Sequence, residues 1–520
     1  MPRAEPPHDT EVMPRIRRPR AALAAASSLA ALAVAAAVGL TGCVGGVPSV
    51  STVGEVDFVR PLAIPPLASS TIVDGVRVFD LAARAGETQF VEGRATATWG
   101  FNGTHLGPTL RAARGETVAV RVRNDLDEPT TVHWHGMHLP ARMDGGPHQM
   151  VDPGEEWTPT WAIDQPAATL WYHPHPHGET ERHVNNGLAG MFVLDDAVES
   201  ALPLPRDYGV DDVPVIVQDV AFAADGSFRT REAGFTGHLG DELLVNGTLG
   251  PYLDVSTDVV RLRLLNASAA RLYGFAFSDS RRFDMIASDG GLLDAPVPLE
   301  HLTLSPGERA EIVVEMRPGE SVVLQSTRPQ LGGVVGFAGG DAGGGDTLDV
   351  LELRAAASLE RRGTVPASLA PVERLDPLDA TAERRYTLDD TQINQRRMDM
   401  GRIDEVVELD ATEVWVVRNT MAFAHNFHVH DVQFQIVSIA GQPPPPELAG
   451  RKDTVYVRPN EEYRLVMRFT DYADAEHPYM YHCHLLRHED QGMMGQFVVV
   501  ARGTEVDSVP APTMENDHEH

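Results

Sequence analysis

One pattern occurs three times in this chain of 520 residues, and it limits the choice of folds more than any other feature. In each copy a short apolar segment ends in an asparagine, and a Pro-Gly-Glu or Pro-Asn-Glu turn downstream leads into another apolar segment. The copies are Asn124 with residues 153–155, Asn266 with residues 306–308, and Asn419 with residues 459–461. The apolar segments alternate in the way that half-buried strands do. Such a repeat predicts similar domains in tandem, so we expect an all-β chain of three β-sandwiches.

The length of the chain also agrees with about three domains. The repeats and the polar joins between them predict the limits of each part. We expect a signal and tether at residues 1–52, domains at 53–200, 201–370 and 371–505, and a disordered tail at 506–520.

The N-terminal segment has the features of an export signal. Basic residues between Arg15 and Arg20 precede an Ala/Leu/Val run at 21–40, which ends in Leu-Thr-Gly-Cys at Cys43. This ending resembles a bacterial lipoprotein signal, in which the cysteine becomes the lipidated N-terminus. An uncleaved membrane anchor and a plain secretory signal are the alternatives. The lipoprotein reading predicts an exported protein held by lipid on the outer face of the cytoplasmic membrane.

The net charge and the cysteine content narrow the range of possible functions. The formal net charge of −31 argues against a nucleic-acid partner, because a phosphate backbone requires a basic surface. The chain has two cysteines, and lipid would consume Cys43, which leaves Cys483 without a partner for a disulfide. A lone thiol in an oxidising compartment is explained by metal ligation.

Histidines are concentrated in the first and third copies, whereas the middle copy holds only His238 and His301. They form four His-x-His pairs: His133 with His135, His173 with His175, His428 with His430, and His482 with His484. Residues two apart on a strand face the same side, so the pairs offer eight imidazoles, more than one ion would use. Zinc also accepts imidazole ligands. We expect a cluster of metal ions between the first and third domains, with the middle domain as a spacer.

A second site follows from strand parity. Cys483 lies between two histidines of a pair and therefore faces the opposite side, and His425 is an odd number of residues before His428. Both fall on a common side, and His488 and Met493 follow closely enough to join them. Two histidines, a cysteine and a weak methionine ligand are typical of blue copper electron-transfer sites, whereas zinc gives no reason for such a set.

These residues closely resemble the multicopper oxidases, especially three-domain bacterial laccases and cuprous oxidases. The resemblance runs from about residue 95 to residue 500. It is carried by Asn102-Gly103 with Gly107-Pro108, His133-Trp134-His135-Gly136, Asp164 to Ala168, Trp171 to His175, Val245-Asn246-Gly247, Asp289-Gly290-Gly291, Tyr481 to His484, and Gly492-Met493-Met494. It implies cupredoxin-like Greek-key sandwiches for all three domains.

The resemblance also implies four copper ions and their ligands. Type 1 copper would be held by His425, Cys483, His488 and axial Met493, and type 2 copper by His133 and His428. The type 3 pair would be held by His135, His173, His175, His430, His482 and His484. Asp144 and Glu489 stand where the family has acidic residues that relay protons to the cluster. The remaining histidines nearby (His138, His148, His177, His183 and His477) match no ligand position.

The chain departs from the family at three places. Asn426 replaces the proline of the usual His-Pro-Phe-His, a change at a non-ligand position for which we expect little effect, and Asp431 replaces a common glycine. The methionine-rich insertion of cuprous oxidases is absent, although Met398 and Met400 lie close together. Soft thioether ligands are what would bind copper(I), so their absence weakens the case for that substrate.

The resemblance implies a laccase-like enzyme that takes single electrons from phenols or aromatic amines at type 1 copper and reduces dioxygen to water at the three-copper cluster. One alternative is the oxidation of copper(I) or another metal ion in copper tolerance. Another is a non-enzymatic copper-binding or scaffold role, since some relatives have lost their copper ligands. Two-domain copper nitrite reductases are a further enzyme class, which the three repeats argue against.

Overall fold

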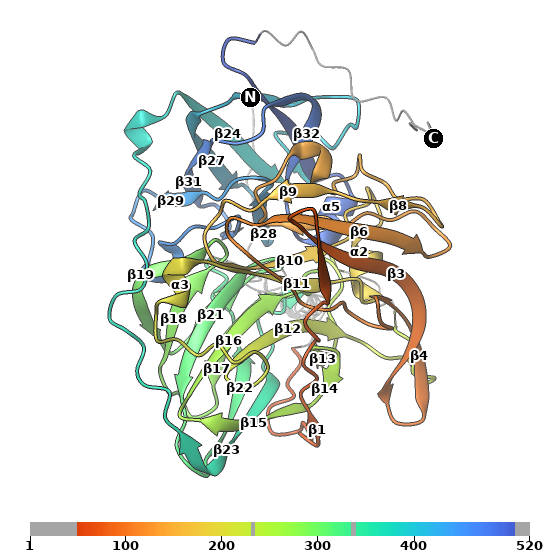
Figure 1. Ribbon diagram of the computed structural model, residues 1–520, viewed down its shortest axis with the longest axis vertical. Helices are drawn as coiled ribbons and strands as arrows, with labels where there is room; N and C mark the ends of the chain where they lie inside the picture. The colour runs from red at the N-terminus through yellow and green to blue at the C-terminus, as the bar shows by residue number, and fades with distance from the viewer. Residues whose placement is uncertain (1–48, 230–233, 334–339, 505–520) are drawn as a thin grey trace, which may run out of the picture. The chain divides into compact units, whose positions relative to one another are not determined.

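The computed structural model describes residues 49–229, 234–333 and 340–504 (Figure 1). The predicted signal with Cys43, up to residue 48, and the predicted tail at 506–520 lie outside the described residues. Within the described part of the chain, no helix is long and apolar enough to cross a membrane.

The first copy forms a four-stranded sheet, β5-β11-β10-β7, and a six-stranded sheet built on β2-β3-β6-β8 with β4 and β9 at its sides. Its strands are β2 Ser70–Val73, β3 Val76–Val91, β4 Arg94–Phe101, β5 Leu110–Ala113, β6 Thr117–Asp125, β7 His133–His135, β8 Glu156–Trp157, β9 Thr160–Ala162, β10 Ala168–His173 and β11 Gly190–Asp195. Its short helices are η1 Ala141–Met143, α2 Thr180–Asn185 and α3 Ala197–Ser200.

The middle copy forms a seven-stranded sheet, β14-β13-β12-β16-β21-β18-β19, and a six-stranded sheet, β1-β15-β23-β22-β17-β20. The strand β1, Arg60–Pro61, comes from the N-terminal side of the chain and pairs in parallel with β15. The other strands are β12 Asp212–Val220, β13 Glu242–Val245, β14 Thr248–Leu249, β15 Pro251–Thr257, β16 Val259–Asn266, β17 Tyr273–Phe277, β18 Phe283–Ser288, β19 Gly291–Leu299, β20 Leu302–Leu304, β21 Arg309–Glu315, β22 Ser321–Thr327 and β23 Leu348–Glu360.

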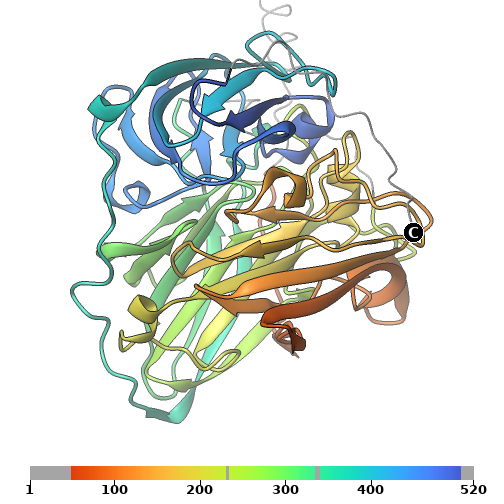
Figure 2. The ribbon, with the colours of Figure 1, turned by 45° about the horizontal axis from the view of Figure 1, so that its top comes forward.

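The third copy forms two five-stranded sheets, β25-β24-β27-β31-β29 and β26-β33-β32-β28-β30. Its strands are β24 Ala382–Asp389, β25 Gln392–Ile393, β26 Glu405–Glu408, β27 Ala411–Asn419, β28 His425–Val429, β29 Gln435–Ile439, β30 Thr454–Val457, β31 Glu462–Phe469, β32 Asp474–His482 and β33 Met494–Val500. Its short helices are η2 Pro377–Asp379, η3 Pro446–Leu448 and α5 Leu486–Asp490. Figure 2 shows the link from β23 to β24 running along the outside of the molecule.

The repeated asparagines close the same connection in every copy. Each side-chain amide donates to two backbone carbonyls, and each side-chain oxygen accepts from the backbone N–H two residues later. The carbonyls belong to Glu128 and Val151 for Asn124, to Arg271 and Leu304 for Asn266, and to Phe423 and Val457 for Asn419. The repeat in the sequence is therefore a repeated structural clasp at the end of β6, β16 and β27.

The repeated turn is fixed to the same asparagine. The backbone N–H groups of Gly154, Gly307 and Asn460 donate to the carbonyls of Asn124, Asn266 and Asn419 at 2.7, 2.9 and 2.8 Å. The three turn residues have φ values of 83°, 84° and 60°. Glycine and asparagine are the residues that most easily adopt this left-handed conformation, which explains their use at the turn.

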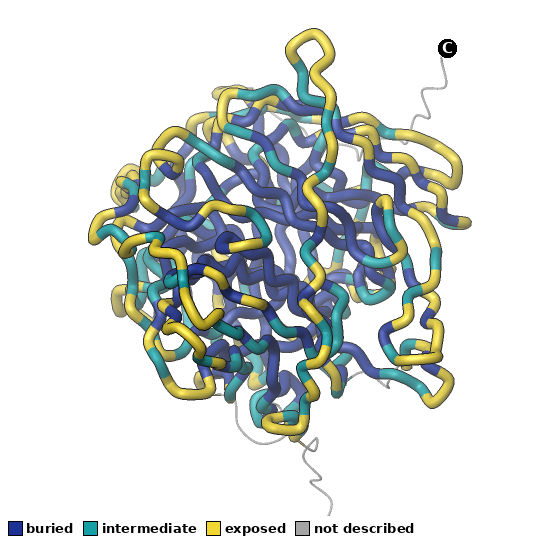
Figure 3. Tube along the Cα trace, turned by 60° about the horizontal axis from the view of Figure 1, so that its bottom comes forward, coloured by how far each residue is buried: buried dark blue, intermediate teal, exposed yellow. Residues whose placement is uncertain are grey.

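Each copy encloses its own hydrophobic cluster. The largest fully buried side chains of the first and third clusters include Trp134 and Trp415, and the middle cluster combines aliphatic residues such as Leu262 with aromatic residues such as Phe275. Figure 3 shows that the buried residues fill the interior of the molecule and that the exposed residues lie mostly on loops at its outside. The all-β fold predicted from the sequence is confirmed.

Candidate metal centre

The strand register brings the histidine pairs of each copy together. β7 and β10 are antiparallel neighbours with His133 opposite His173, and β28 and β32 are antiparallel neighbours with His428 opposite His482. The histidines of the two copies meet, because His175 Nε2 lies 3.2 Å from His482 Nε2. The predicted meeting of first-copy and third-copy histidines is thus present in the structure.

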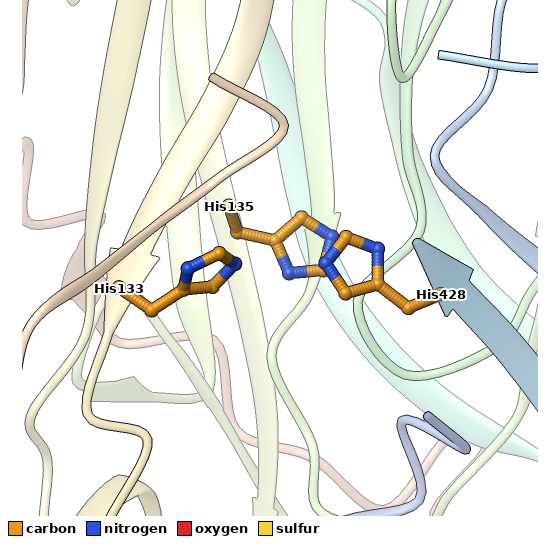
Figure 4. Close-up of side chains that lie close together, drawn as sticks. All are labelled: His133, His135 and His428. Atoms are coloured by element: carbon orange, nitrogen blue, oxygen red, sulfur yellow. The ribbon is translucent and has the colours of Figure 1, made fainter. Parts of the chain in front are cut away.

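The eight histidines divide into groups whose ligand atoms lie within 4.8 Å of one another. The groups are His135, His173 and His484; His175, His430 and His482; and His133 and His428 with His135. Figure 4 shows the rings of His133, His135 and His428 directed toward one another, and the His135 and His428 rings are stacked with centroids 3.7 Å apart. The six residues predicted for the type 3 pair therefore separate into two trios, and the two predicted for type 2 lie between them.

Most of these imidazoles are held through Nδ1, which leaves Nε2 toward the cluster. His133, His428 and His173 approach the carbonyls of Asp144, Asp453 and Pro174 through Nδ1, at 3.0, 2.9 and 2.8 Å. The Nε2 atoms of His133 and His428 are buried and have no hydrogen-bond partner among the described residues. Such an atom requires a ligand of its own.

His135 is reversed. Its Nε2 lies 3.0 Å from Asp453 Oδ1 and 3.0 Å from Thr454 Oγ1, while its Nδ1 lies 3.4 Å from His173 Nε2. Arg309 donates to both carboxylate oxygens of Asp453 at 2.7 and 2.6 Å, so the position of this carboxyl group is fixed. A carboxylate that holds one ring nitrogen decides which nitrogen is left for a metal.

The two acidic residues predicted near the cluster lie at its edge. Asp144 Oδ2 is 2.6 Å from His430 Nδ1, and Asp144 Oδ1 is 3.3 Å from His133 Nδ1. Glu489 contacts the other two rings of the trio that contains His430, with its two oxygens 3.2 Å from His175 Nδ1 and 3.2 Å from His482 Nδ1. Both carboxylates are 1% exposed, so their contacts are with the cluster and not with solvent.

The second predicted site is also assembled. Cys483 Sγ lies 3.8 Å from His425 Nδ1 and 3.5 Å from His488 Nδ1, and all three residues are completely buried. Met493 is buried beside them, and its carbonyl accepts from the Cys483 backbone N–H at 3.1 Å. Burial raises the pKa of the Cys483 thiol to about 12, although backbone hydrogen bonds from Leu485 and Asn426 oppose this. A metal that binds this sulfur must displace the proton.

Burial also keeps the imidazoles neutral. It lowers the pKa of His175 and His484 to about 3 and that of His488 to about 4. Burial, together with neighbouring imidazoles, lowers the pKa well below the usual range for His135, His173, His425, His428 and His430. A neutral imidazole has the free lone pair that a metal requires.

The middle copy contributes no member to these groups, but it contacts both sites. His488 Nε2 lies 3.0 Å from the carbonyl oxygen of Phe235, and a Cβ on Gly307 would lie 3.1 Å from the His484 ring. The middle copy also supplies Arg309, which donates to the Asp453 carboxylate. The middle copy therefore supports the sites as well as separating the outer copies.

The histidines that match no ligand position lie outside these groups. His183 binds Thr130 and Glu128, His148 binds Gln496, and His477 binds Asp474. Sequence reasoning missed Asp453 and Arg309, because no local motif marks them, and it expected little effect from Asn426. Asn426 came closest to being found, since it departs from the usual motif.

The donor set fits copper. Two histidines, one cysteine and a nearby methionine suit a blue copper ion, and imidazoles with unpartnered buried nitrogens suit further copper ions. His425, Cys483, His488 and Met493 would hold the first ion, and the eight paired histidines would hold the cluster.

Comparisons with known proteins agree with this chemistry. Family models described as multicopper oxidase match residues 82–199 and 370–503, the two copies that carry the histidines. A multicopper oxidase of Staphylococcus haemolyticus is 34% identical over 432 residues, which cover 82% of this chain and 89% of the relative. The cell division protein FtsP of Escherichia coli is 38% identical over 445 residues, which cover 85% of this chain and 93% of the relative.

Solved structures show the same likeness. The laccase of Pediococcus acidilactici is 35% identical, with a TM-score of 0.77, and the match covers 85% of this chain and 93% of that chain. A laccase-like oxidase of Ochrobactrum is 36% identical, with a TM-score of 0.77, over 85% of this chain and 100% of that chain. These cupredoxin-like structures extend over nearly the whole described body. The chain therefore belongs to the multicopper oxidase family.

Proposed function

We propose that the protein is a laccase-like oxidase that takes single electrons from phenols or aromatic amines and reduces dioxygen to water with four copper ions. The observation that carries the proposal is the position of Cys483 between His482 and His484. His482 and His484 belong to the two trios, and Cys483 between them belongs to the separate site. Copper bound at these residues supplies one-electron chemistry at Cys483 and multi-electron chemistry at the cluster.

The chain's own residues provide the path and the protons. Two peptide bonds join Cys483 to His482 and His484, so electrons from one site reach both trios through covalent bonds. Oxygen reduction consumes protons, and Asp144 and Glu489 lie beside the Nδ1 atoms of His430, His175 and His482, where carboxylates serve as proton relays.

An aromatic donor is supported by the surroundings of His488. The rings of Phe235 and Phe423 have centroids 4.5 Å apart, and the Phe235 ring centroid is 4.9 Å from that of His488. Both phenylalanines are half-buried. A phenol or aromatic amine that stacks on them comes close to a type 1 ligand.

A role in cell division without oxidation is the second candidate, because the chain is 38% identical to FtsP. Its complete set of ligand residues supports the enzyme instead. Oxidation of copper(I) or another metal ion is a third outcome to test, since the chain also resembles a Campylobacter jejuni multicopper oxidase described as a metallo-oxidase, at 26% identity.

The deciding experiment measures copper content and oxygen uptake of copper-loaded protein with a simple phenol, with copper(I), and with no donor. We expect copper at both sites, a blue colour and faster uptake with the phenol. Faster uptake with copper(I) would favour metal oxidation, and a colourless protein without turnover would favour the scaffold role. Cys483→Ser should abolish colour and turnover together, and intense colour in that variant would exclude Cys483 as the anchor.

Export and lipid anchoring through Cys43 belong to the same proposal. They predict that the full chain appears in the membrane fraction with a lipidated N-terminal cysteine in the mature protein. Cys43→Ser should release the protein or block its processing, and mass spectrometry of the N-terminus measures this. A mature N-terminus without lipid would contradict the anchor.

A further inference from the structure

A polar cavity lies between the first and third copies, outside the two predicted copper sites. Its volume is about 430 Å³, which is in the range of small-molecule sites. The first copy contributes Arg114 and Gln165, the third copy contributes Gln433 and Arg451, and the link between β23 and β24 contributes Glu373. None of the ligand residues described above lines this cavity.

Two of the arginines in the cavity wall already have acidic partners. Arg114 pairs with Asp164 at 2.9 Å, and Arg468 pairs with Glu373 at 3.1 Å. All four residues line the cavity, so the charges of each pair cancel within it.

The amide groups of the wall are paired as well. The side-chain nitrogens of Gln165 and Gln433 both donate to the carbonyl of Gly136 at 2.9 Å. Gly136 directly follows the predicted ligand His135, so these two amides join the first and third copies next to the metal centre.

Arg451 is the exception among the charged residues of the cavity. Its side chain is half-buried, and it forms no ion pair and no hydrogen bond with any residue that the structure describes. Burial lowers the pKa of its guanidinium, which the nearby charges of Glu373 and Asp294 only partly offset. Those two carboxylates already pair with Arg468 and Arg374. Because a charge withdrawn from water is costly without a partner, this position favours a bound anion.

The surrounding charges limit the kind of anion. A guanidinium presents a planar fork of N–H donors that matches the two oxygens of a carboxylate. Arg451 offers a single unpaired positive charge, and Asp164, Glu373 and Asp471 also line the cavity. A second negative charge on the anion would be repelled by these carboxylates, so a monoanion fits better than sulfate or phosphate.

The remaining wall is suited to an apolar group. It is formed by Ala162, Pro166, Leu375 and the ring of Tyr472. A carboxylate held at the guanidinium could therefore carry an aliphatic or aromatic body that packs against these residues.

We propose that this cavity binds a small organic monocarboxylate through the guanidinium of Arg451. The bound carboxylate supplies the partner that Arg451 lacks, and its body contacts both the first and the third copy. Occupation of the site therefore holds these two copies together beside Gly136. The site is separate from the copper ligands, and its occupation does not depend on which donor the copper sites oxidise.

The first test is isothermal titration calorimetry of the copper-loaded full chain at constant ionic strength. The probes are benzoate, benzamide, which has the same shape without the charge, and sulfate. We expect saturable binding of benzoate, at least about tenfold tighter than benzamide, because the contact is a hydrogen bond between charged groups. Sulfate should bind more weakly than benzoate. Absence of saturable benzoate binding, or equal affinity for any two of the probes, would overturn the proposal.

The second test assigns the binding to Arg451. Arg451→Gln should weaken benzoate binding by about tenfold or more. Arg282→Gln is the control, because Arg282 is exposed in the middle copy and pairs with Glu300 at 3.2 Å, and its affinity for benzoate should be native. Native affinity in Arg451→Gln would mean that benzoate binds elsewhere, the copper sites included, and would refute the proposed site.

Melting temperatures separate a ligand site from a structural role of Arg451. Without benzoate, Arg451→Gln should melt at or above the native temperature, because it loses a half-buried charge that has no partner. Benzoate should raise the melting temperature of the native protein and of Arg282→Gln, and leave that of Arg451→Gln unchanged. A lower melting temperature of Arg451→Gln without benzoate would show that Arg451 stabilises the fold itself, contrary to the proposal.

Discussion

Asp453 determines which nitrogen His135 presents, and it does so as one member of a buried ion pair. Replacement of Asp453 by alanine leaves His135 Nε2 with Thr454 as its one remaining partner and leaves the fully buried Arg309 without its bidentate partner. Loss of one partner of a buried pair costs about 3–5 kcal/mol, and loss of a carboxylate that orients a ligand weakens metal binding about 10–100-fold. We expect Asp453→Ala to retain less copper after dialysis against a chelator and to unfold at lower denaturant.

The control for Asp453 is Asp164, whose exposed side chain pairs with Arg114 at 2.9 Å. Because exposed ion pairs contribute at most about 1 kcal/mol, Asp164→Ala should keep native copper content and nearly native stability. Native copper content in Asp453→Ala would show that the chain does not need this carboxylate to orient His135.

A second single-residue prediction concerns Asp144 and its role in proton transfer to the cluster. Asp144→Asn keeps the size of a side chain that lies 2.6 Å from His430 Nδ1 but removes the carboxylate that would relay protons. Stopped-flow measurements should show normal reduction of type 1 copper by the donor and slower reoxidation by dioxygen. Reoxidation at the native rate over the whole pH range would exclude Asp144 as the proton carrier.

At the scale of the element, the repeated turn makes a matched comparison. Gly154 and Gly307 occupy the same turn with φ values of 83° and 84°, so alanine strains the backbone equally at both, by about 1 kcal/mol. A Cβ at Gly154 meets nothing within 4 Å, whereas at Gly307 it lies 3.1 Å from the His484 ring.

Gly307→Ala should therefore change the optical and magnetic spectra of the loaded cluster and lower its copper content, while Gly154→Ala should lower stability alone. Spectra and copper content of the two purified variants measure the difference. Identical behaviour of the two variants would mean that the middle turn does not press on His484.

The repeated elements also show which parts of the fold and of the site the sequence can predict. Strand alternation and the repeated asparagines are local signals, and they suffice for three β-rich copies and for His-x-His pairs that face one side. The parity of Cys483 and His425 is local as well. By contrast, His135 and Asp453 are 318 positions apart, and Arg309 and Asp453 are 144 apart. Contacts between domains leave no spacing in the sequence, so these supports became visible only in the fold.

At the scale of the whole molecule, the cluster joins segments that are far apart in the chain: His175 and His482 are 307 positions apart, and their Nε2 atoms lie 3.2 Å from each other. Folding must therefore bury many neutral imidazoles at one interface, and their burial couples stability to pH. The pKa values of about 3 for His175 and His484 and about 4 for His488 lie below the usual value of an unfolded histidine.

The sign of the effect follows from proton binding. Between those low values and about pH 6.5 the unfolded chain binds protons at these three histidines and the native chain does not, so stability is full above pH 6.5 and falls as the pH falls. At about pH 5.5 each group removes about 1.4 kcal/mol from the free energy of unfolding, or about 4 kcal/mol for the three.

Denaturant unfolding of the copper-free protein at about pH 7.5 and about pH 5.5 measures the total loss, to which the other buried histidines add. His484→Gln should lose about 1.4 kcal/mol less than native between the two pH values, because one buried imidazole is gone. His177→Gln, at an exposed histidine, should lose as much as native. The exposed carboxylates of this acidic chain are common to all three proteins, so their contribution cancels from the comparison. An equal loss in His484→Gln and native would show that His484 is not held neutral by the fold.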